Sequence, residues 1–408
     1  MAPQRPETEL LLCCARASID SKTRARIQTL LQRALQWDHL RRLAQDHRVL
    51  PALYRNLTQL APPTLPRVTL ASLRADFHAN AWRSFFLTRE LLKLLHLLQT
   101  NDIAAIPYKG PTLAASLYGK LALRQFNDLD ILIRRRDFPK VKNLFINNGY
   151  RPHLPLTPRQ EASRLRRHHE YAFVRADDRV FVEIHWGVTK SVASFPIDFE
   201  HLWRHRQTIS LLGTPISSFS PEDLLLILCV HGYKHRWTHL NWICDIAQLI
   251  HAHAASMNWH RVMRQAACSG GERILFVGLL LAKELLEAQV PKAVLTQMQA
   301  DSAAKWLAMQ VCERLFSRTD QGLGGLEQAI YHLRMRERLS DRLNYFFRHF
   351  LRNDLPQLVV PNPKDRSLLA LPVFPSFLCC LRRPFRLLKE YGLSPFRHLI
   401  RSLAGRQP

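Results

Sequence analysis

The chain has 408 residues, of which 47% are apolar, and a mean hydropathy of −0.17, values typical of a soluble globular protein with two or three domains. No apolar run reaches the roughly 20 residues that a membrane helix needs, and Glu7 and Glu9 precede a very short apolar stretch. We therefore expect neither a membrane-spanning helix nor a secretory signal peptide. We expect a cytoplasmic protein.

The charge balance is strongly basic. Lys and Arg number 58 and Asp and Glu 33, which gives a formal net charge of +25. Such a field attracts polyanions, whether nucleic acid, anionic lipid or phosphorylated substrates. A GC-rich genome, which favours arginine codons, would give the same excess without a polyanionic partner, so charge alone does not choose between these alternatives.

The eight cysteines indicate a reducing compartment. Four of them form the adjacent pairs Cys13–Cys14 and Cys379–Cys380, and the sequence has neither a CxxC motif nor zinc-knuckle spacing. Most lie in apolar surroundings. We expect buried, reduced thiols.

Residues 1–100 are predicted to form an N-terminal helical region. Residues 8–60 carry apolar side chains at helical spacing, a pattern that Pro51 interrupts, and residues 62–67 are rich in proline. Residues 70–100 are predicted to form one or two long amphipathic helices.

Residues 101–219 are predicted to form an α+β core, because short apolar strands alternate here with short helices. The expected order is a strand (103–108), a glycine turn (109–112), a short helix ending at Gly119, a strand (129–134), a helix ending at Gly149, a basic loop (151–169), two strands within 170–186, and a hairpin (208–219).

Residues 220–408 are predicted to form a C-terminal helical region with a basic tail. Ser220 is a natural N-cap, Pro221 suits the first helical position, and Asp223 completes the capping pattern. The tail at 382–408 alternates apolar and basic residues, as a helix at an anionic membrane surface would. The alternative is a tail that packs against the body with its arginines exposed.

Two aspartates at the head of a strand are the first candidate site. In "DLDILI" the strand period of two places Asp128 and Asp130 on one face, and Leu129, Ile131 and Ile133 on the other. Two carboxylates on one face repel each other unless a cation lies between them, and Mg²⁺ suits such oxygen ligands together with substrate phosphates. Taken alone, the pair is more typical of a turn and a solvated strand end.

The segments before and after these aspartates favour a catalytic site over a solvated strand end. Upstream, Gly110 lets the backbone approach a phosphate and Lys109 offers a positive charge at a helix N-terminus. Downstream, Glu183 lies in the middle of an apolar strand, with Phe181 and His185 on its face, and its burial is costly unless a charge or metal compensates it. Three carboxylates on neighbouring strands beside a glycine turn are typical of two-metal phosphoryl or nucleotidyl transfer.

These residues resemble a known family. The stretch "YKGPTLAASLYGKLALRQFNDLDILIRRRDFPKVKNLFINNGY", followed by "VEIHW", is similar to bacterial nucleotidyltransferase-like proteins of the polymerase-β superfamily, in a branch associated with polysaccharide or peptide natural-product biosynthesis. Segments such as "WDHLRRLAQDHRVLPALYRNL" and "PEDLLLILCVHGYKHRWTHLNWICDIAQLI" extend the resemblance over nearly the whole chain. It implies a mixed or antiparallel sheet with helices, flanked by the two helical regions.

The resemblance also implies roles for six residues. Asp128, Asp130 and Glu183 would be the catalytic, metal-binding carboxylates, with Glu183 orienting or deprotonating the acceptor hydroxyl. The residues implied in contacts with the nucleotide phosphates are Lys109, Gly110 and Arg124. The chain departs from the usual pattern in one respect: Pro111 follows Gly110, and seventeen residues separate Gly110 from Asp128, a longer gap than usual.

Two further segments leave alternatives open. His231 and His235 are spaced as a metal pair on a helix, with Asp245 downstream, but Gly232 stands where a zinc-protease helix needs Glu. We favour scaffolding or the wall of an acceptor pocket. The basic segment 164–171 would either grip an anionic ligand or be a solvated loop.

The sequence therefore predicts a nucleotidyltransferase that uses Mg²⁺ or Mn²⁺ and an NTP to modify a hydroxyl or phosphate of a small-molecule, saccharide or peptide acceptor. One alternative is RNA as the acceptor, which we disfavour because no RNA-binding stretch is recognisable. The other is a non-catalytic scaffold or peripheral membrane protein that keeps the fold, with the tail at 382–408 on the membrane.

Overall fold

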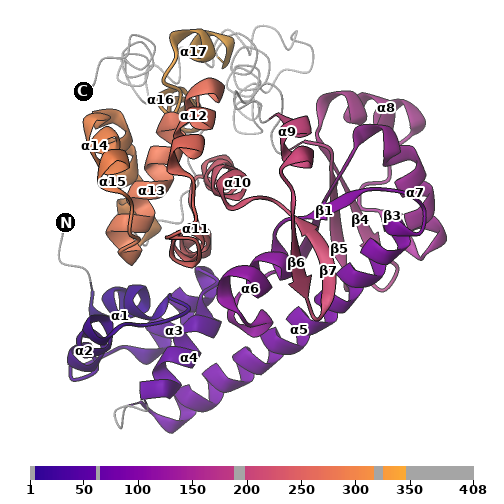
Figure 1. The fold of residues 1–408 in the computed structure, drawn as a ribbon. Helices are drawn as coiled ribbons and strands as arrows, with labels where there is room; N and C mark the ends of the chain where they lie inside the picture. The colour runs from indigo at the N-terminus through magenta and orange to yellow at the C-terminus, as the bar shows by residue number, and fades with distance from the viewer. Residues whose placement is uncertain (1–4, 61–64, 188–197, 317–324, 346–408) are drawn as a thin grey trace, which may run out of the picture.

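The computed structural model describes residues 5–60, 65–187, 198–316 and 325–345. Over these residues the protein is α+β, with helices at both ends of the chain and a sheet between them (Figure 1). The predicted fold class is confirmed. The domain limits at 100 and 219 stay predictions, and the basic tail at 382–408 lies outside the described residues.

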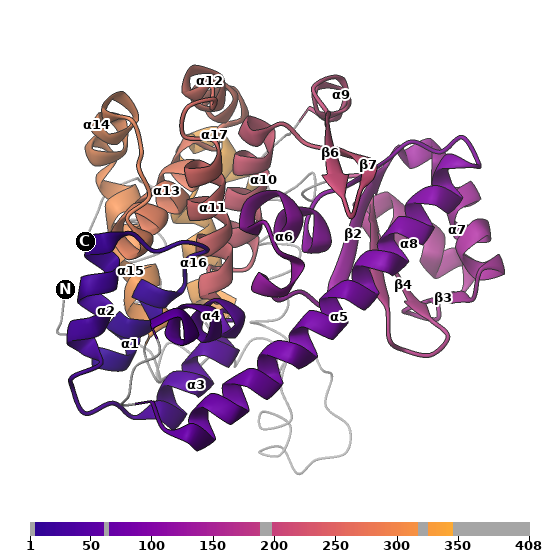
Figure 2. The ribbon, with the colours of Figure 1, turned by 60° about the horizontal axis from the view of Figure 1, so that its bottom comes forward.

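The N-terminal helices are α1 (Pro6–Cys14), α2 (Ser21–Leu30), α3 (Trp37–Asp46), α4 (Leu50–Leu60) and α5 (Arg67–Gln99). Pro51 lies in the first turn of α4, where proline is tolerated. The second amphipathic segment forms the single helix α5, whose 33 residues extend about 50 Å at 1.5 Å per residue. It runs from the N-terminal helices to the sheet (Figures 1 and 2).

The core elements are β1 (Ala105–Pro107), α6 (Gly110–Tyr118), β2 (Asp128–Ile133), α7 (Phe138–Asn147), β3 (Tyr150–Pro152), α8 (Pro158–Arg167), β4 (Glu170–Arg175), β5 (Phe181–His185), α9 (Phe199–Arg204), β6 (Gln207–Leu211) and β7 (Thr214–Ser218). The larger sheet has the order β1-β2-β5-β4-β3 and is mixed: β2 and β5 are parallel, and the other neighbours are antiparallel. The strands β6 and β7 form the predicted hairpin.

The prediction of a basic loop over 151–169 is wrong. The structure has β3 at its start and the helix α8 further on. A capping box starts α8, because the Thr157 side chain accepts a hydrogen bond from the backbone of Gln160, whose side chain accepts one from the backbone of Thr157. Arginines at the C-terminal end of the helix, which favour its dipole, had suggested a loop.

The C-terminal helices are α10 (Pro221–Lys234), α11 (Leu240–Ala252), α12 (Trp259–Ser269), α13 (Glu272–Leu286), α14 (Lys292–Ala300), α15 (Ser302–Leu315), α16 (Gly325–Arg334) and α17 (Leu339–Tyr345). No helix among the described residues is long and apolar enough to cross a membrane. The six described cysteines are free thiols; four are buried as expected, whereas Cys268 is exposed and Cys312 half-buried.

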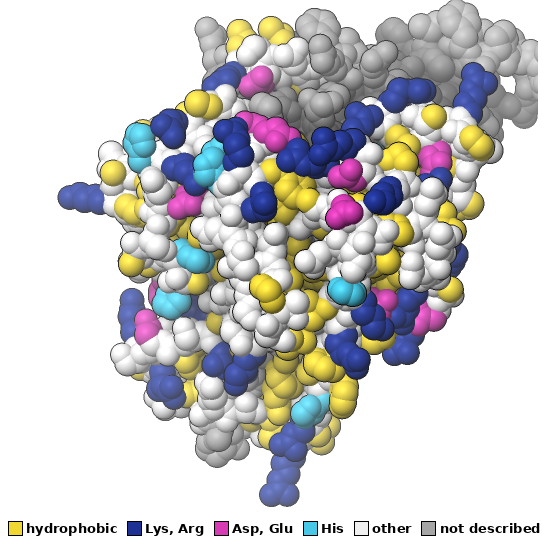
Figure 3. Space-filling view, turned by 45° about the vertical axis from the view of Figure 1, so that its right-hand side comes forward, with side chains coloured by type: hydrophobic (Ala, Val, Ile, Leu, Met, Phe, Trp, Pro, Cys, Tyr) yellow, Lys and Arg dark blue, Asp and Glu magenta, His cyan; other side chains and the backbone are white. Residues whose placement is uncertain are grey.

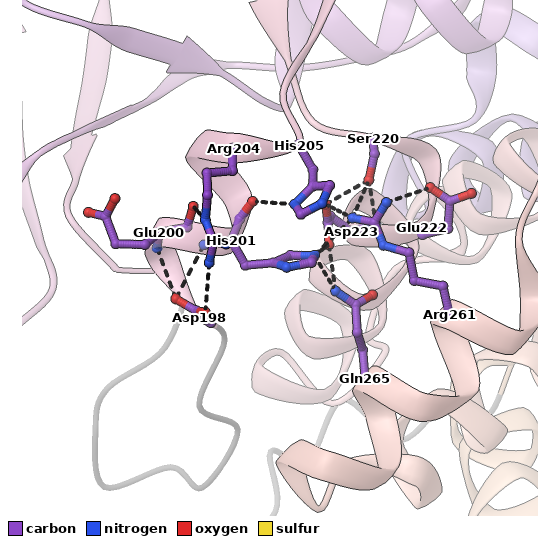
Figure 4. A network of polar contacts seen from close by, with 10 residues as sticks. All are labelled: Asp198, Glu200, His201, Arg204, His205, Ser220, Glu222, Asp223, Arg261 and Gln265. Atoms are coloured by element: carbon purple, nitrogen blue, oxygen red, sulfur yellow. Dashed lines mark hydrogen bonds and ion pairs between the residues drawn. The ribbon is translucent and has the colours of Figure 1, made fainter.

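A polar network fixes the start of α10 (Figure 4). Ser220 is the N-cap, and its hydroxyl accepts a hydrogen bond from the backbone of Asp223 and donates one to the Asp223 carboxylate. Arg261 and Gln265 of α12 bind the same carboxylate, and both donate to Nε2 of His201 in α9, at 2.8 and 2.7 Å. This network joins α9, α10 and α12.

The strand β2 separates two hydrophobic cores. Leu132 packs with Leu residues of the N-terminal and C-terminal helices in one core, so the two terminal regions share it. Leu129, Ile131 and Ile133 belong to the other core, which α5, α7 and the remaining strands complete. The predicted apolar face of this strand is confirmed.

A buried ion pair joins the α+β core to the C-terminal helices. Arg124 donates from Nε and Nη2 to both carboxylate oxygens of Asp245 in α11, each at 2.8 Å, and the hydroxyl of Tyr118 donates to the same carboxylate at 2.8 Å. The side chains of Arg124 and Asp245 are 7% and 1% exposed. A charge so deeply buried depends on its partner.

We predict that Asp245→Asn lowers the free energy of unfolding by about 3–5 kcal/mol, because the guanidinium of Arg124 loses the charge that compensates its burial. Urea titration measures the change. The matched control is Asp178→Asn, which breaks an ion pair with Arg151 whose side chains are 69% and 54% exposed, and which should cost less than about 1 kcal/mol. Equal effects of the two substitutions would contradict this role of Asp245.

Candidate active site

The register of β2 and β5 brings the predicted carboxylates together. Asp130 is paired with Glu183, and Asp128 precedes Asp130 by two residues on the same strand. Directly paired residues of neighbouring strands point to the same face of a sheet. All three carboxylates therefore belong to one face. On the opposite face, the paired residues Leu129 and Val182 are fully buried in the core.

Asp130 is the most deeply buried of the three, with a side chain that is 1% exposed. Its Oδ1 accepts from Nζ of Lys109 at 2.9 Å and lies 3.0 Å from Nε2 of His185. The other oxygen, Oδ2, is buried and has no hydrogen-bond partner among the described residues. Glu183 is half-buried, with a side chain that is 28% exposed, and its Oε2 lies 3.3 Å from the same Nε2 of His185. One carboxylate is thus enclosed and the other accessible.

The two aspartates differ in their electrostatics. Burial alone would raise the pKa of Asp130, but the ammonium of Lys109 and the hydrogen bond from His185 hold that pKa well below its usual range. Burial raises the pKa of Asp128, and the charge of Asp130 adds to this rise. The repulsion between the two carboxylates is what a bound cation would relieve.

The residues present fit a divalent metal. Ligand atoms of Asp130, Glu183 and His185 lie within 4.8 Å of one another. The unpartnered Oδ2 of Asp130 is a further oxygen ligand, of the kind that Mg²⁺ and Mn²⁺ prefer. Asp128 is not part of this set of atoms and lies at the head of the strand, half-buried. His185 was not among the predicted site residues. The alternation of β5 had placed its side chain on the same face as Glu183, but no role was assigned to it.

The helix α6 begins beside the head of β2. Gly110 is its first residue, with φ of +48°, and a Cβ at this position would lie 3.1 Å from the carbonyl oxygen of Asp128. This close approach explains the glycine. Lys109 is the N-cap, and the charges of Asp130 and Asp128 raise its pKa although burial opposes them. The positive end of α6 and the ammonium of Lys109 together make this edge attractive to an anion.

Arg124, which the resemblance assigns to the nucleotide phosphates, is engaged in the buried ion pair with Asp245. Its Nε and Nη2 bind Asp245, so a phosphate contact from Arg124 would need this ion pair to open or would have to use Nη1. The role of Arg124 in nucleotide binding stays a prediction. Asp245 was a partner that the sequence did not reveal, because it lies 121 residues further along the chain.

The C-terminal end of α10 lies near the carboxylates. Lys234 reaches Oε2 of Glu170 at 3.3 Å, and Nδ1 of His185 lies 3.8 Å from the same oxygen. The rings of His231 and His235 lie 4.6 Å apart, and burial, together with the charge of Lys109, holds the pKa of His231 well below its usual value. Neither histidine belongs to a metal-competent cluster found among the described residues.

Comparison with known proteins gives one family. The model of a family described as "Uncharacterised nucleotidyltransferase" matches residues 33–287, more than half of the chain, from before α3 to the end of α13. The solution structure of the antibiotic-resistance factor ANT(2'')-Ia is similar at 11% identity and a TM-score of 0.32, over 45% of this chain and 91% of that one. A search of curated proteins finds no match. The extent of the family match shows that the chain belongs to this family of nucleotidyltransferases.

Proposed function

We propose that the protein transfers a nucleotidyl group from an NTP, with Mg²⁺ or Mn²⁺, to a hydroxyl or phosphate of a small-molecule, saccharide or peptide acceptor. In this reaction an acceptor oxygen attacks the α-phosphorus, the bond from that phosphorus to the bridging oxygen breaks, and pyrophosphate leaves. The observation that carries the proposal is the pairing of Asp130 with Glu183 beside the N-terminus of α6.

In this proposal the carboxylates have separate roles. Asp128 and Asp130 hold the metal, since Asp130 is enclosed and its Oδ2 has no other partner among the described residues. Glu183 completes the metal site and, as the more accessible carboxylate, orients the acceptor hydroxyl or accepts its proton. A bound divalent cation would neutralise charge on the transferring phosphate.

Lys109 is proposed to exchange partners. Its ammonium compensates the charge of Asp130 at 2.9 Å in this structure. If a bound cation compensated the charge of Asp130 instead, Lys109 would be free to contact the triphosphate at the start of α6, the positive end of that helix.

The acceptor is proposed to approach from the side of α10. The opposite face of β2 and β5 is filled by Leu129, Ile131, Val182 and Ile184, all fully buried, so a ligand cannot enter there. The polar face looks toward the end of α10, where Lys234 reaches Glu170. On the molecular face in Figure 3, Lys and Arg side chains are scattered among Asp and Glu, a distribution that gives no specific reason to choose RNA as the acceptor.

We predict that Asp130→Asn lowers Mg²⁺-dependent NTP turnover by two to three orders of magnitude, about the loss expected when one preorganised charge is removed from a transition state. Turnover is measured by pyrophosphate release with a panel of NTPs and candidate acceptors. The control is Asp177→Asn in the β4–β5 turn, whose side chain is 41% exposed. Wild-type turnover in Asp130→Asn, with its fold verified by circular dichroism, would refute the assigned site.

A second prediction concerns the exchange of partners by Lys109. We expect Lys109→Met to weaken NTP binding about tenfold or more, because a charged contact with a phosphate is lost. The same substitution should strengthen Mn²⁺ binding in the absence of NTP, because the ammonium no longer competes for Asp130. Calorimetric titrations measure both constants, with the exposed Lys120→Met as the control. A decrease in both affinities would contradict the exchange.

A further inference from the structure

A second cluster of metal-ligating side chains lies beside the carboxylates. Its members are His169, Glu170 and His185, of which His185 is shared with the cluster of Asp130 and Glu183. Glu170 begins β4 and is paired with His185 across the antiparallel β4–β5 ladder, so the two side chains share a face. His169 precedes β4, and its carbonyl accepts a hydrogen bond from the backbone of Trp186 at 2.9 Å.

The three side chains converge on one point. Nε2 of His169 lies 3.2 Å from Oε2 of Glu170, and Nδ1 of His185 lies 3.8 Å from the same oxygen. One ligand atom of each residue lies within 4.8 Å of the other two. Ligands of a tetrahedral zinc ion, at bond lengths of about 2.0–2.1 Å, are separated by roughly 3.4 Å. Small side-chain movements would therefore bring all three onto one ion.

Two nitrogen atoms of the cluster lack hydrogen bonds. His169 is 6% exposed; its Nε2 faces Glu170, whereas its Nδ1 makes no hydrogen bond within the described ranges. His185 is 3% exposed, and its Nδ1 makes none either. Buried polar atoms almost always have a hydrogen-bond partner, so two ring nitrogens without one, beside a single carboxylate, call for a ligand.

The backbone makes room for this arrangement. A Cβ at Gly187 would lie only 2.8 Å from Cβ of His169, so a larger residue at this position would force the histidine away. Glycine after β5 thus allows His169 to lie against the end of the strand. His169 is placed by the fold rather than by a flexible surface loop.

His185 connects the two clusters through its two ring nitrogens. Nε2 faces the carboxylate oxygens of Asp130 and Glu183, so where the carboxylates alone hold the first ion, Nε2 carries the proton and donates to them. In the neutral ring Nδ1 then has a lone pair, directed toward Glu170. A histidine that binds a metal with one nitrogen and donates to a carboxylate with the other is a common arrangement in metal sites.

Lys234 competes for this position. Its Nζ lies 3.3 Å from Oε2 of Glu170, the oxygen on which the histidines converge. The ammonium supplies part of the positive charge that a metal would supply. A metal at the cluster must therefore displace Lys234, and removal of this lysine should strengthen metal binding.

We propose that His169, Glu170 and His185 bind a divalent transition metal such as Zn²⁺, in a site distinct from the carboxylate site and joined to it by the imidazole of His185. Two imidazoles and one carboxylate are a known ligand set of zinc, which leaves a fourth position for water or another ligand. Nitrogen ligands favour such an ion over Mg²⁺. The proposal goes beyond nucleotidyl transfer and does not depend on it.

The test is a titration of the metal-free full chain with Co²⁺, followed by its visible absorption, and with Zn²⁺ by calorimetry. We expect one high-affinity equivalent, which His169→Asn weakens at least tenfold and Lys234→Met strengthens. Mg²⁺ binding should persist in His169→Asn. Because the readout is metal binding, the result is independent of transferase activity.

Controls locate the ion. The exposed His251→Asn should leave Co²⁺ binding unchanged, and His235→Asn tests the histidine pair of α10. Loss of binding in His235→Asn but not in His169→Asn would overturn the proposal, as would the absence of a high-affinity equivalent. If His169→Asn does not fold, Glu170→Gln and Lys234→Met decide: the proposal requires weaker binding in the first and tighter binding in the second.

Discussion

The rest of the site depends on one constraint, the burial of the Asp130 carboxylate within β2. A charge with a 1% exposed side chain is stable only where other charges compensate it, and here Lys109 and His185 do so through a single oxygen. The second oxygen has no partner among the described residues. Its two partners tie the start of α6, through Lys109, and the end of β5, through His185, to the middle of β2.

The sheet can hold such a carboxylate because β2 is covered differently on its two faces. One face is a dry core of Leu129 and its neighbours, and the other looks toward the helices at both ends of the chain, which share the second core. The buried ion pair between Arg124 and Asp245 fastens these helices to the α+β core. In the proposed function, a cation, a nucleotide and an acceptor would meet between this sheet and the helices that are joined to it.

Local patterns in the sequence were sufficient for β1, β2, β4, β5 and the β6–β7 hairpin, but not for the short strand β3. Period-two alternation placed Asp130 and Glu183 on the polar faces of their strands, and the N-cap of α10 was readable from Ser220. These two strands were expected to be neighbours, but the register that pairs Asp130 with Glu183 was not readable, because local patterns do not specify contacts between residues 53 positions apart. The partner of Arg124 was hidden for the same reason. The helix α8 was missed. Thr157 carried a helix-capping signal, but the arginines near the end of the helix were interpreted as part of a loop.

The most direct test of the account is a crystal structure of the protein with Mn²⁺ and a non-hydrolysable NTP analogue, in which anomalous scattering locates the metal. We predict a manganese peak within coordination distance of Oδ2 of Asp130, with the phosphates directed to the start of α6 at Gly110. A complex with the analogue bound elsewhere, or without manganese at Asp130, would contradict the account.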